Sequence, residues 1–541
     1  MKQLKKFFSS RIILFGIFML ILLTSLKIDY RFTEDFKCCG DDHTYFVHAE
    51  TISEDFDLDY SNQMVFVEGK TIMVEDKVVP IGFIGAGLLA APFMLIGIFI
   101  DNLLNFLNFK TNELMNYKLL LYSLAPVFYF FSTIFIFEKI LRLLNIKYKI
   151  LYLILIFFGS GLHYYAFERF SMTHVYEVFC VTILIYLLLI FYESDNLKNS
   201  IAGIIPYIFM ITYLVRYTNY FIFVVPFWLT KMMKSKYQNK KLRFNKYFLL
   251  NSVISLGLFS MLTNSLYGRF TLSPLVVYNK ESYPLVSHYL NVSAERGNII
   301  LDNLNMLFRI FYTQEFGLIW FIPIVFASLI YLLIDTLRDF SKSAPLNIFI
   351  LLSIGMPIGT ILIWQTVGSA FGMRYMYAVL PISFLAYMFI SQKYNLKILN
   401  IYTIIFSFIS FLSVLFFETS SASSLSENEV INSFGDFTRF AQPEYLSGFL
   451  KSILSLDSYF IIFGTSFLGA SIIKIFLSIM GMDDFINFLS NFGVSIDNVD
   501  VVKIFNNIDL IESHKFIFVI LFLSIFSYYF SKQVIKDYKF Q

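Results

Sequence analysis

The chain has 541 residues, of which 57% are hydrophobic and 15% are charged, with a net charge of +3. Soluble domains carry about 25% charged residues, so the composition excludes an ordinary soluble protein, and the small net charge gives no sign of a nucleic-acid partner. Apolar runs of about 18 or more residues recur along the whole length. They predict an all-α polytopic membrane protein, with about 11–13 transmembrane helices plus interfacial helices in the first outer loop.

The first span is expected from Ile12 to Ile28, preceded by basic residues that place the N-terminus in the cytoplasm. The following segment, 29–80, is an acidic outer loop, because residues 29–79 hold 13 Asp and Glu against 4 Lys and Arg. Within it, the spacing from Asp41 to Ser53 predicts a short helix at the membrane surface.

Residues 81–100 are apolar but contain four glycines and Pro92. If they crossed the membrane, two basic stretches would fall outside: 138–149, with four basic residues and one acidic, and 231–246, with seven basic residues and none acidic. If 81–100 lies in the outer interface or re-enters, both stretches become cytoplasmic, as the positive-inside rule requires. We therefore predict an interfacial or re-entrant helix here, short and broken.

The remaining spans, after residue 100, alternate in the direction in which they cross the membrane. They are expected at 117–141, 149–166, 172–192, 200–215, 219–233, 246–268, 311–334, 346–365, 375–391 and 398–417, and the outer loops at 167–171, 216–218, 269–310, 366–374 and 418–456. Residues 1–417 then form one transmembrane module, and 418–541 form an outer loop with about two further helices. The acidic stretch 481–514 conflicts with strict alternation, so whether 457–480 spans is left open.

Asp41 and Asp42 are the first candidate catalytic residues. A carboxylate at an outer membrane surface can act as a general base toward a hydroxyl group or can hold a metal ion. The alternative is a solvated acidic loop without a chemical role.

A second group of polar residues lies at the outer ends of two successive spans. It consists of His163, Glu168, Arg169, His174 and Glu177. His174 and Glu177 are three residues apart and share a helix face. Ionisable residues at membrane depth are functional candidates, because burying them in lipid costs several kcal/mol. The alternative is an interfacial polar belt.

Two arginines, Arg216 and Arg374, are also expected at outer helix ends. A guanidinium group presents a fork of donors that matches phosphate oxygens. Gly368 and Gly372 precede Arg374 and would let the backbone approach a ligand closely. The alternative for both arginines is a side chain that extends to lipid headgroups.

Several segments, in order, resemble polytopic glycosyltransferases of the GT-C type. The resemblance is to the bacterial branch related to protein mannosyltransferases and to the lipopolysaccharide aminoarabinose and galacturonic acid transferases, and it covers about residues 10–390. The segments are 40–45 (GDDHTY), 57–62 (DLDYSN), 82–92 (GFIGAGLLAAP), 170–174 (FSMTH), 216–219 (RYTN), 316–323 (FGLIWFIP) and 368–374 (GSAFGMR). One position departs from the pattern: many relatives have a His where Val79-Pro80 stands here.

The resemblance implies transfer of a sugar from a polyprenyl-phosphate donor to a lipid, glycan or protein acceptor, with inversion and on the extracytoplasmic face. Asp41 would be the general base, and Asp42 would orient the acceptor or bind a divalent cation. No other cofactor is implied. The implied substrate-binding residues are Tyr45, Glu168, His174, Glu177, Arg216 and Arg374. The branch also implies a bacterial inner membrane. Two other classes of membrane protein are also consistent with the sequence: an O-antigen polymerase or ligase, and a polytopic lipid or solute transporter.

Overall fold

The computed structural model describes most of the chain. It covers residues 10–28, 40–63, 72–74, 77–80, 82–109, 116–193, 198–233, 245–274, 299–312, 317–364, 371–416, 453–494, 504–505, 508 and 512–539. Large parts of the predicted outer loops 269–310, 366–374 and 418–456, and the side chain of Asp41, lie outside the described residues.

The described part of the chain is almost entirely helical, and nine of its helices are long and apolar enough to cross a membrane. They are α4 (Gly85–Phe106), α5 (Tyr117–Leu143), α8 (His174–Glu193), α9 (Lys198–Val215), α11 (Lys246–Tyr267), α16 (Phe340–Trp364), η8 (Arg374–Val379) continued by α17 (Leu380–Lys393), α18 (Lys397–Leu415) and α26 (Ser513–Lys539). The chain is thus a polytopic helical membrane protein.

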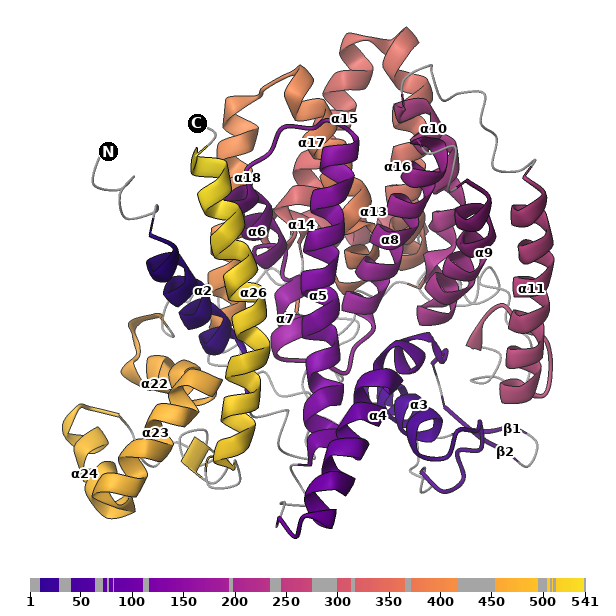
Figure 1. Ribbon diagram of the computed structural model, residues 1–541. Coiled ribbons are helices and arrows are strands. Elements are labelled where there is room, and N and C mark those ends of the chain that lie inside the picture. Colours follow the sequence, from indigo (N-terminus) through magenta and orange to yellow (C-terminus); the bar gives the residue numbers. More distant parts are fainter. Residues whose placement is uncertain are drawn as a thin grey trace.

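Shorter elements fill in around these helices. They are α2 (Arg11–Ser25), α3 (Gly40–Glu54), α6 (Ile150–Phe158), α7 (Leu162–Phe167), η4 (Tyr217–Val224), α10 (Val225–Met232), α13 (Ile299–Tyr312), α14 (Leu318–Phe321), α15 (Pro323–Arg338), α22 (Leu456–Gly464), α23 (Phe467–Met480) and α24 (Met482–Asn491). Strands β1 (Ile72–Val74) and β2 (Lys77–Val79) form one antiparallel hairpin, with Ile72 opposite Val79. Figure 1 shows α3, the hairpin and α22–α24 at its lower end, with the end of α26 at the upper end.

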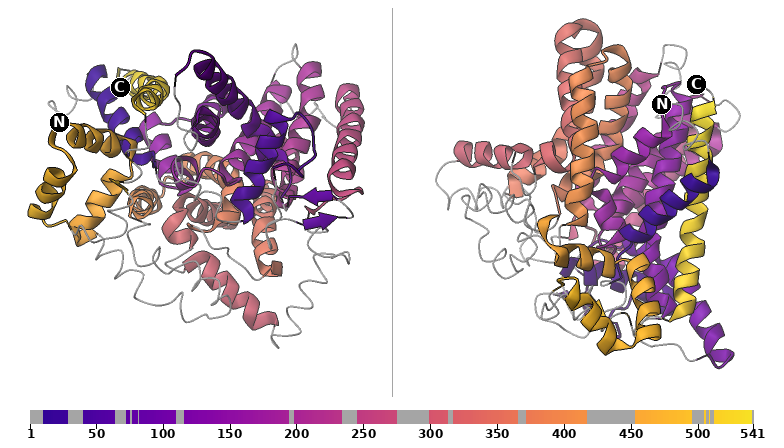
Figure 2. Two further views of the ribbon diagram at one scale, coloured as in Figure 1. Left: turned by 90° about the horizontal axis from the view of Figure 1, so that it is seen from below. Right: turned by 90° about the vertical axis from the view of Figure 1, so that its left-hand side faces the viewer.

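The most buried long helices are α5, α8 and the η8–α17 pair, which form the centre of the bundle, whereas α4, α11 and α18 are mostly exposed and lie at its edge (Figure 2). This division follows from packing: α5 contacts both α4 and α8, and α8 in turn contacts α9. The helix predicted from Asp41 to Ser53 is confirmed as α3.

The helix α4 differs from the prediction of a short, broken helix. It runs without a break for 22 residues and contains Pro92 in its interior. Its glycines serve close packing instead of a break: a Cβ at Gly97 would lie 2.3 Å from the carbonyl oxygen of Tyr117, and one at Gly87 would lie 2.3 Å from Cβ of His48. These contacts press α4 against α5 and α3.

Some predicted spans are divided into shorter elements, and 311–334 contains both α14 and α15. The 149–166 span is divided into α6 and α7 by Gly161, whose φ of +77° is a left-handed conformation that other residues avoid. The stretch 457–480, for which the sequence left spanning open, is divided into α22 and α23, and its middle is bonded to the end of α2. There the N–H of Ile28 donates to the carbonyl of Thr465 (2.7 Å), and Nζ of the buried Lys27 donates to Oγ1 of Thr465 (3.0 Å).

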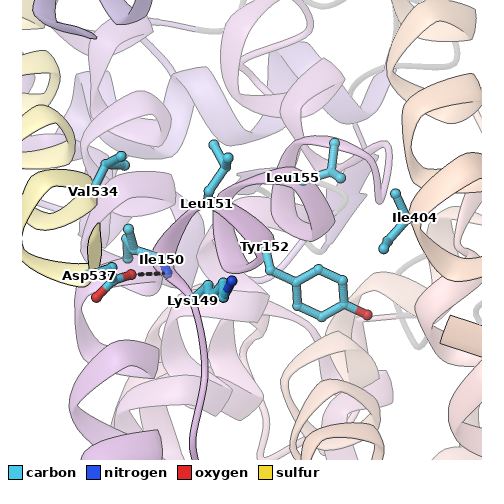
Figure 3. A pocket seen from close by; sticks show the side chains of 8 residues that line it. All are labelled: Lys149, Ile150, Leu151, Tyr152, Leu155, Ile404, Val534 and Asp537. Carbon is cyan, nitrogen blue, oxygen red and sulfur yellow. Dashed lines mark hydrogen bonds between the residues drawn. The ribbon is translucent and has the colours of Figure 1, made fainter. Parts of the chain in front are cut away.

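The C-terminal helix α26 is integrated into the bundle. It packs along α2 and α5, and the rings of Phe131 and Phe526 stack at 4.1 Å. Near its end, Asp537 accepts a hydrogen bond from the N–H of Ile150 (2.7 Å) and so caps the start of α6 beside a small cavity of about 190 Å³ (Figure 3). The described helix α26 therefore packs with the rest of the bundle, and the predicted division of the chain after residue 417 stays a prediction.

The close approach of α4 to α5 can be tested with two matched glycine substitutions. Gly97→Ala should destabilise the protein by about 1–3 kcal/mol, because its Cβ would meet backbone atoms that cannot move aside easily. Gly257→Ala in α11 is the control, since nothing lies within 4 Å of its Cβ position. It should leave stability unchanged or raise it by up to about 1 kcal/mol. Thermal unfolding in detergent measures both, and equal melting temperatures for the two variants would contradict the packing argument.

Candidate functional site

Most of the residues singled out from the sequence meet at the lower end of the bundle in Figure 1. They come from α3, the turn between α7 and α8, the start of α8, the end of α9 and the start of η8. The buried ionisable members are Asp42, Glu168, His174 and Glu177. Asp41 is the second residue of α3.

Asp42 is buried and forms an ion pair with Arg169. Its Oδ2 accepts hydrogen bonds from Nη2 (2.8 Å) and Nε (3.2 Å) of Arg169. The hydroxyl of Ser171 donates to the main-chain carbonyl of Asp42 (2.7 Å) and lies 2.9 Å from the hydroxyl of Tyr122. The first turn of α3 is therefore bonded to the α7–α8 turn by both side chain and backbone.

A second ion pair lies at the start of α8. Oε1 of Glu177 lies 3.2 Å from Nη1 of Arg216 and 3.7 Å from Nδ1 of His174, and it accepts the hydroxyl of Thr173 (2.5 Å). Nδ1 of His174 lies 3.4 Å from the same Nη1 of Arg216. The predicted shared face of His174 and Glu177 is thus observed, and both side chains are turned to Arg216.

The two arginines predicted to bind phosphate lie around one aromatic ring. The guanidinium carbon of Arg216 is 4.5 Å from the ring centre of Tyr375, and that of Arg374 is 5.2 Å from it. A cation over an aromatic face is attracted by the ring quadrupole, which helps hold both side chains in place. Gly372, with a φ of +62°, forms the turn that leads into this segment.

Tyr165 lies beside the second ion pair. Its ring is 4.5 Å from the His174 ring, and its hydroxyl donates to the carbonyl of Phe371 (2.8 Å). Tyr165 therefore joins the start of α8 to the segment that leads into η8. We refer to the two ion pairs together with Arg374 and Tyr375 as the charged cluster.

Tyr45 and Glu168 lie at the borders of this cluster. The ring of Tyr45 is so close to Gly82 that a Cβ there would lie 2.7 Å from Cε1 of Tyr45. Glu168 is buried at the end of α7, next to Arg169 in the chain. His163, also noted from the sequence, packs its ring against Phe158 and Phe411.

The sequence reasoning missed several members of the site. Arg169 was noted without an assigned role, although its place next to Glu168 in an apolar region was a signal. Nothing in the sequence marked Tyr165, Ser171 or Tyr375 among so many aromatic and hydroxyl residues. Their roles depend on contacts between segments that are far apart in the chain.

The hypothesis of a divalent cation does not fit these residues. Among the described side chains, no group of three or more His, Cys, Asp and Glu could hold a metal ion. The carboxylate of Asp42 is neutralised by Arg169, and that of Glu177 by Arg216. Divalent cations require several oxygen ligands, and arginine occupies that position in both pairs.

Comparison with known proteins gives no family assignment: no protein-family profile, no curated protein and no solved structure matches the chain.

The helix α3 carries a buried histidine that makes stability depend on pH. Nδ1 of His48 is 2.7 Å from the hydroxyl of Tyr60, and Nε2 is 2.9 Å from the carbonyl oxygen of Gly82, so a neutral ring with its proton on Nε2 satisfies both contacts. Burial lowers the pKa of His48 to about 4. Below pH 6.5 the unfolded chain takes up a proton on this ring, whereas the folded protein does not until about pH 4.

Stability should therefore fall as the pH drops from about 6.5 to about 4, and the loss from this group should reach about 3 kcal/mol. His48→Gln should weaken this pH dependence, measured as the melting temperature in detergent across the range. His514→Gln is the matched control, because the His514 side chain is partly exposed beside Glu512. A His48→Gln variant with the same pH profile as the parent protein would contradict this account.

Proposed function

We propose that the protein is a membrane glycosyltransferase. It transfers a sugar from a polyprenyl-phosphate donor to a hydroxyl group on a lipid, glycan or protein acceptor. The observation that carries the proposal is that carboxylates and guanidinium groups from distant segments pair beside the start of α8: Asp42 of α3 is bonded to Arg169, and Glu177 is paired with Arg216, which shares the ring of Tyr375 with Arg374. Carboxylates suit a hydroxyl nucleophile, and guanidinium groups suit an anionic leaving group.

The charge distribution supports an extracytoplasmic location for this end. The connection from α5 to α6, at the opposite end, holds four basic residues and one acidic residue between 138 and 149. Lys231 at the end of α10 and Lys246 at the start of α11 lie at that same basic end. The positive-inside rule assigns such an end to the cytoplasm. A polyprenyl-phosphate donor presented from the outer leaflet would then meet the site.

The proposed reaction is a single displacement. The acceptor oxygen forms a bond to the anomeric carbon, the bond between that carbon and the phosphate oxygen breaks, and polyprenyl phosphate leaves. The hydroxyl proton passes to the carboxylate of Asp41, and the configuration at the anomeric carbon inverts. Arg216 and Arg374 stabilise the negative charge that grows on the phosphate. His174 and Glu177 hold Arg216 in place for this task.

The contacts of Asp42 separate the roles of the two neighbouring carboxylates. A guanidinium group favours the charged form of the carboxylate that it binds, so Asp42 is a poor proton acceptor. Its ion pair with Arg169 and the bond from Ser171 suit a residue that fixes the start of α3. Asp41 is therefore the proposed base, and Asp42 positions the segment that carries it. Tyr45 and Glu168 border the proposed sugar and acceptor pocket.

The role of Asp41 is tested by Asp41→Asn, which should lower transfer from a defined polyprenyl-phosphate sugar by about 10²–10⁴-fold, the usual contribution of a general base. Insertion and melting temperature should stay unchanged. Asp57→Asn is the matched control in the same segment: Asp57 is exposed and accepts only a local bond from the N–H of Asp59 in a turn, and its loss should not affect transfer. Full activity of the Asp41→Asn variant would reject the assignment of Asp41 as the general base.

Substrate counterflow across vesicles without sugar transfer would favour the alternative class, a transporter.

The phosphate-binding role is tested by Arg374→Lys, which keeps the charge but removes the planar fork of donors. The value of kcat/KM for the donor should fall by about 10–100-fold, as expected for the loss of a charge-assisted hydrogen bond. The KM for the acceptor should stay the same. Arg338→Lys, at the end of α15, is the control for the general effect of replacing an arginine by a lysine. A value of kcat/KM for the donor equal to that of the parent protein would place Arg374 outside the phosphate pocket.

A further inference from the structure

A large apolar cavity lies beside the bundle core, separate from the charged cluster. Its volume is about 910 Å³, within the range of cavities that hold lipid-sized or drug-sized ligands. Residues of α9, η4, α10 and α11 line it, and we refer to it as the α9–α11 slot. Its aromatic and apolar lining includes Phe209, Phe223, Phe227, Phe248 and Phe259.

The slot lies beside α11, a helix with few close neighbours among the described residues. This helix packs against α9, where the hydroxyl of Tyr207 donates to Oδ1 of Asn251 (2.8 Å), and it is the least buried of the nine long helices. Phe227 on α10 borders the slot from the other side and is largely exposed. The slot therefore opens toward the surroundings of the bundle between α10 and α11.

The chemistry of the lining residues favours a hydrocarbon chain as the occupant of the slot. The slot lies among helices of spanning length, where the surrounding solvent is lipid. Its lining includes hydroxyl groups, but those of Tyr213, Tyr220, Thr230, Ser252 and Ser255 are bonded within the protein, which leaves them poorly suited to hold water. An empty slot of this size would forfeit the dispersion contacts of its aromatic walls. An acyl chain from the bilayer can enter from the side and make those contacts.

Aromatic rings gather at the end of the slot that includes Tyr213. The rings of Phe83, Tyr213 and Phe259 meet there, with centroid distances of 5.8–6.3 Å. The hydroxyl of Tyr213 also donates to the carbonyl of Leu272 (2.7 Å), another lining residue. The residues that line the slot do not include Asp42, Arg169, Glu177 or Arg216, so the slot is a candidate site of its own.

The other end of the slot is basic. Thr230 and Phe248 line this end. Lys231 comes directly after Thr230 in the chain, and Lys246 comes two residues before Phe248. Both lysines are exposed. Nζ of Lys231 donates one hydrogen bond to the carbonyl of Pro345 and lies 4.7 Å from the ring centre of Phe349, which stacks on Phe227 of the slot. A phosphate between these two ammonium groups would complement their charge.

We propose that the α9–α11 slot is a binding site for an anionic phospholipid of the leaflet at the basic end. One acyl chain lies in the slot, and the phosphate lies between Lys231 and Lys246. This site is distinct from the glycosyl-transfer site and does not depend on the proposed function.

Native mass spectrometry of the full chain tests the proposal, with phosphatidylglycerol and phosphatidylcholine of identical acyl chains as probes. The protein should retain phosphatidylglycerol preferentially. The double variant Lys231→Gln/Lys246→Gln should lose most of this preference, about five-fold for each lysine, while phosphatidylcholine binding persists. The matched control is Lys342→Gln/Lys397→Gln, which removes two exposed charges at the same end on α16 and α18. It should keep the preference.

A second variant tests the slot itself. Ser255 is buried and lines the slot, so Ser255→Phe should fill it and reduce retention of both lipids at least ten-fold. If this variant does not fold, the lysine pair still decides the question. An equal loss of preference in the two lysine double variants would overturn the proposal. So would displacement of the bound phospholipid by polyprenyl phosphate, because the slot would then hold the tail of a substrate.

Discussion

The central constraint on this structure is that a charge inside a membrane bundle must have a partner. Asp42 and Glu177 are almost completely buried, and each is bonded to an arginine from another segment, Arg169 and Arg216 respectively. Removing one partner of a buried ion pair commonly costs about 3–5 kcal/mol, because the remaining charge is left in a low-dielectric surrounding. The two pairs therefore determine how α3, the α7–α8 turn, α8 and the end of α9 meet.

The same pairing shapes the proposed chemistry. A carboxylate held by a guanidinium group is fixed in position and remains charged, which suits a structural or positioning role better than proton transfer. Arg216 is in turn oriented by Glu177, His174 and the ring of Tyr375 before any substrate arrives. Preorganised charges of this kind are effective in catalysis because they need no rearrangement during the reaction.

The sequence predicted the positions of helices well where a long apolar run alone determines them. The spans at 117–141, 172–192 and 246–268 match α5, α8 and α11 closely, because a long apolar run has one stable form in a membrane.

The sequence was less informative where the surroundings of a single residue determine whether a helix continues or breaks. Pro92 suggested a broken helix, yet α4 continues, since its glycines allow tight packing against neighbours that are distant in the chain. Gly161 gave no comparable warning, but its left-handed conformation divides a predicted span into α6 and α7. For the site, charged residues in an apolar chain were conspicuous, whereas Tyr165 and Tyr375 could be recognised only through their three-dimensional neighbours.

The helix α9 links the charged cluster with the proposed lipid site. Its end carries Arg216, and its face toward α11 lines the slot through Phe209 and Tyr213. A bound lipid can shift a conformational equilibrium only by as much as its affinity differs between the two states. Arg216 is already fixed by Glu177 and Tyr375. The ion pair therefore sets the geometry at Arg216, and a lipid bound as proposed would act on α9 and α11 through their packing.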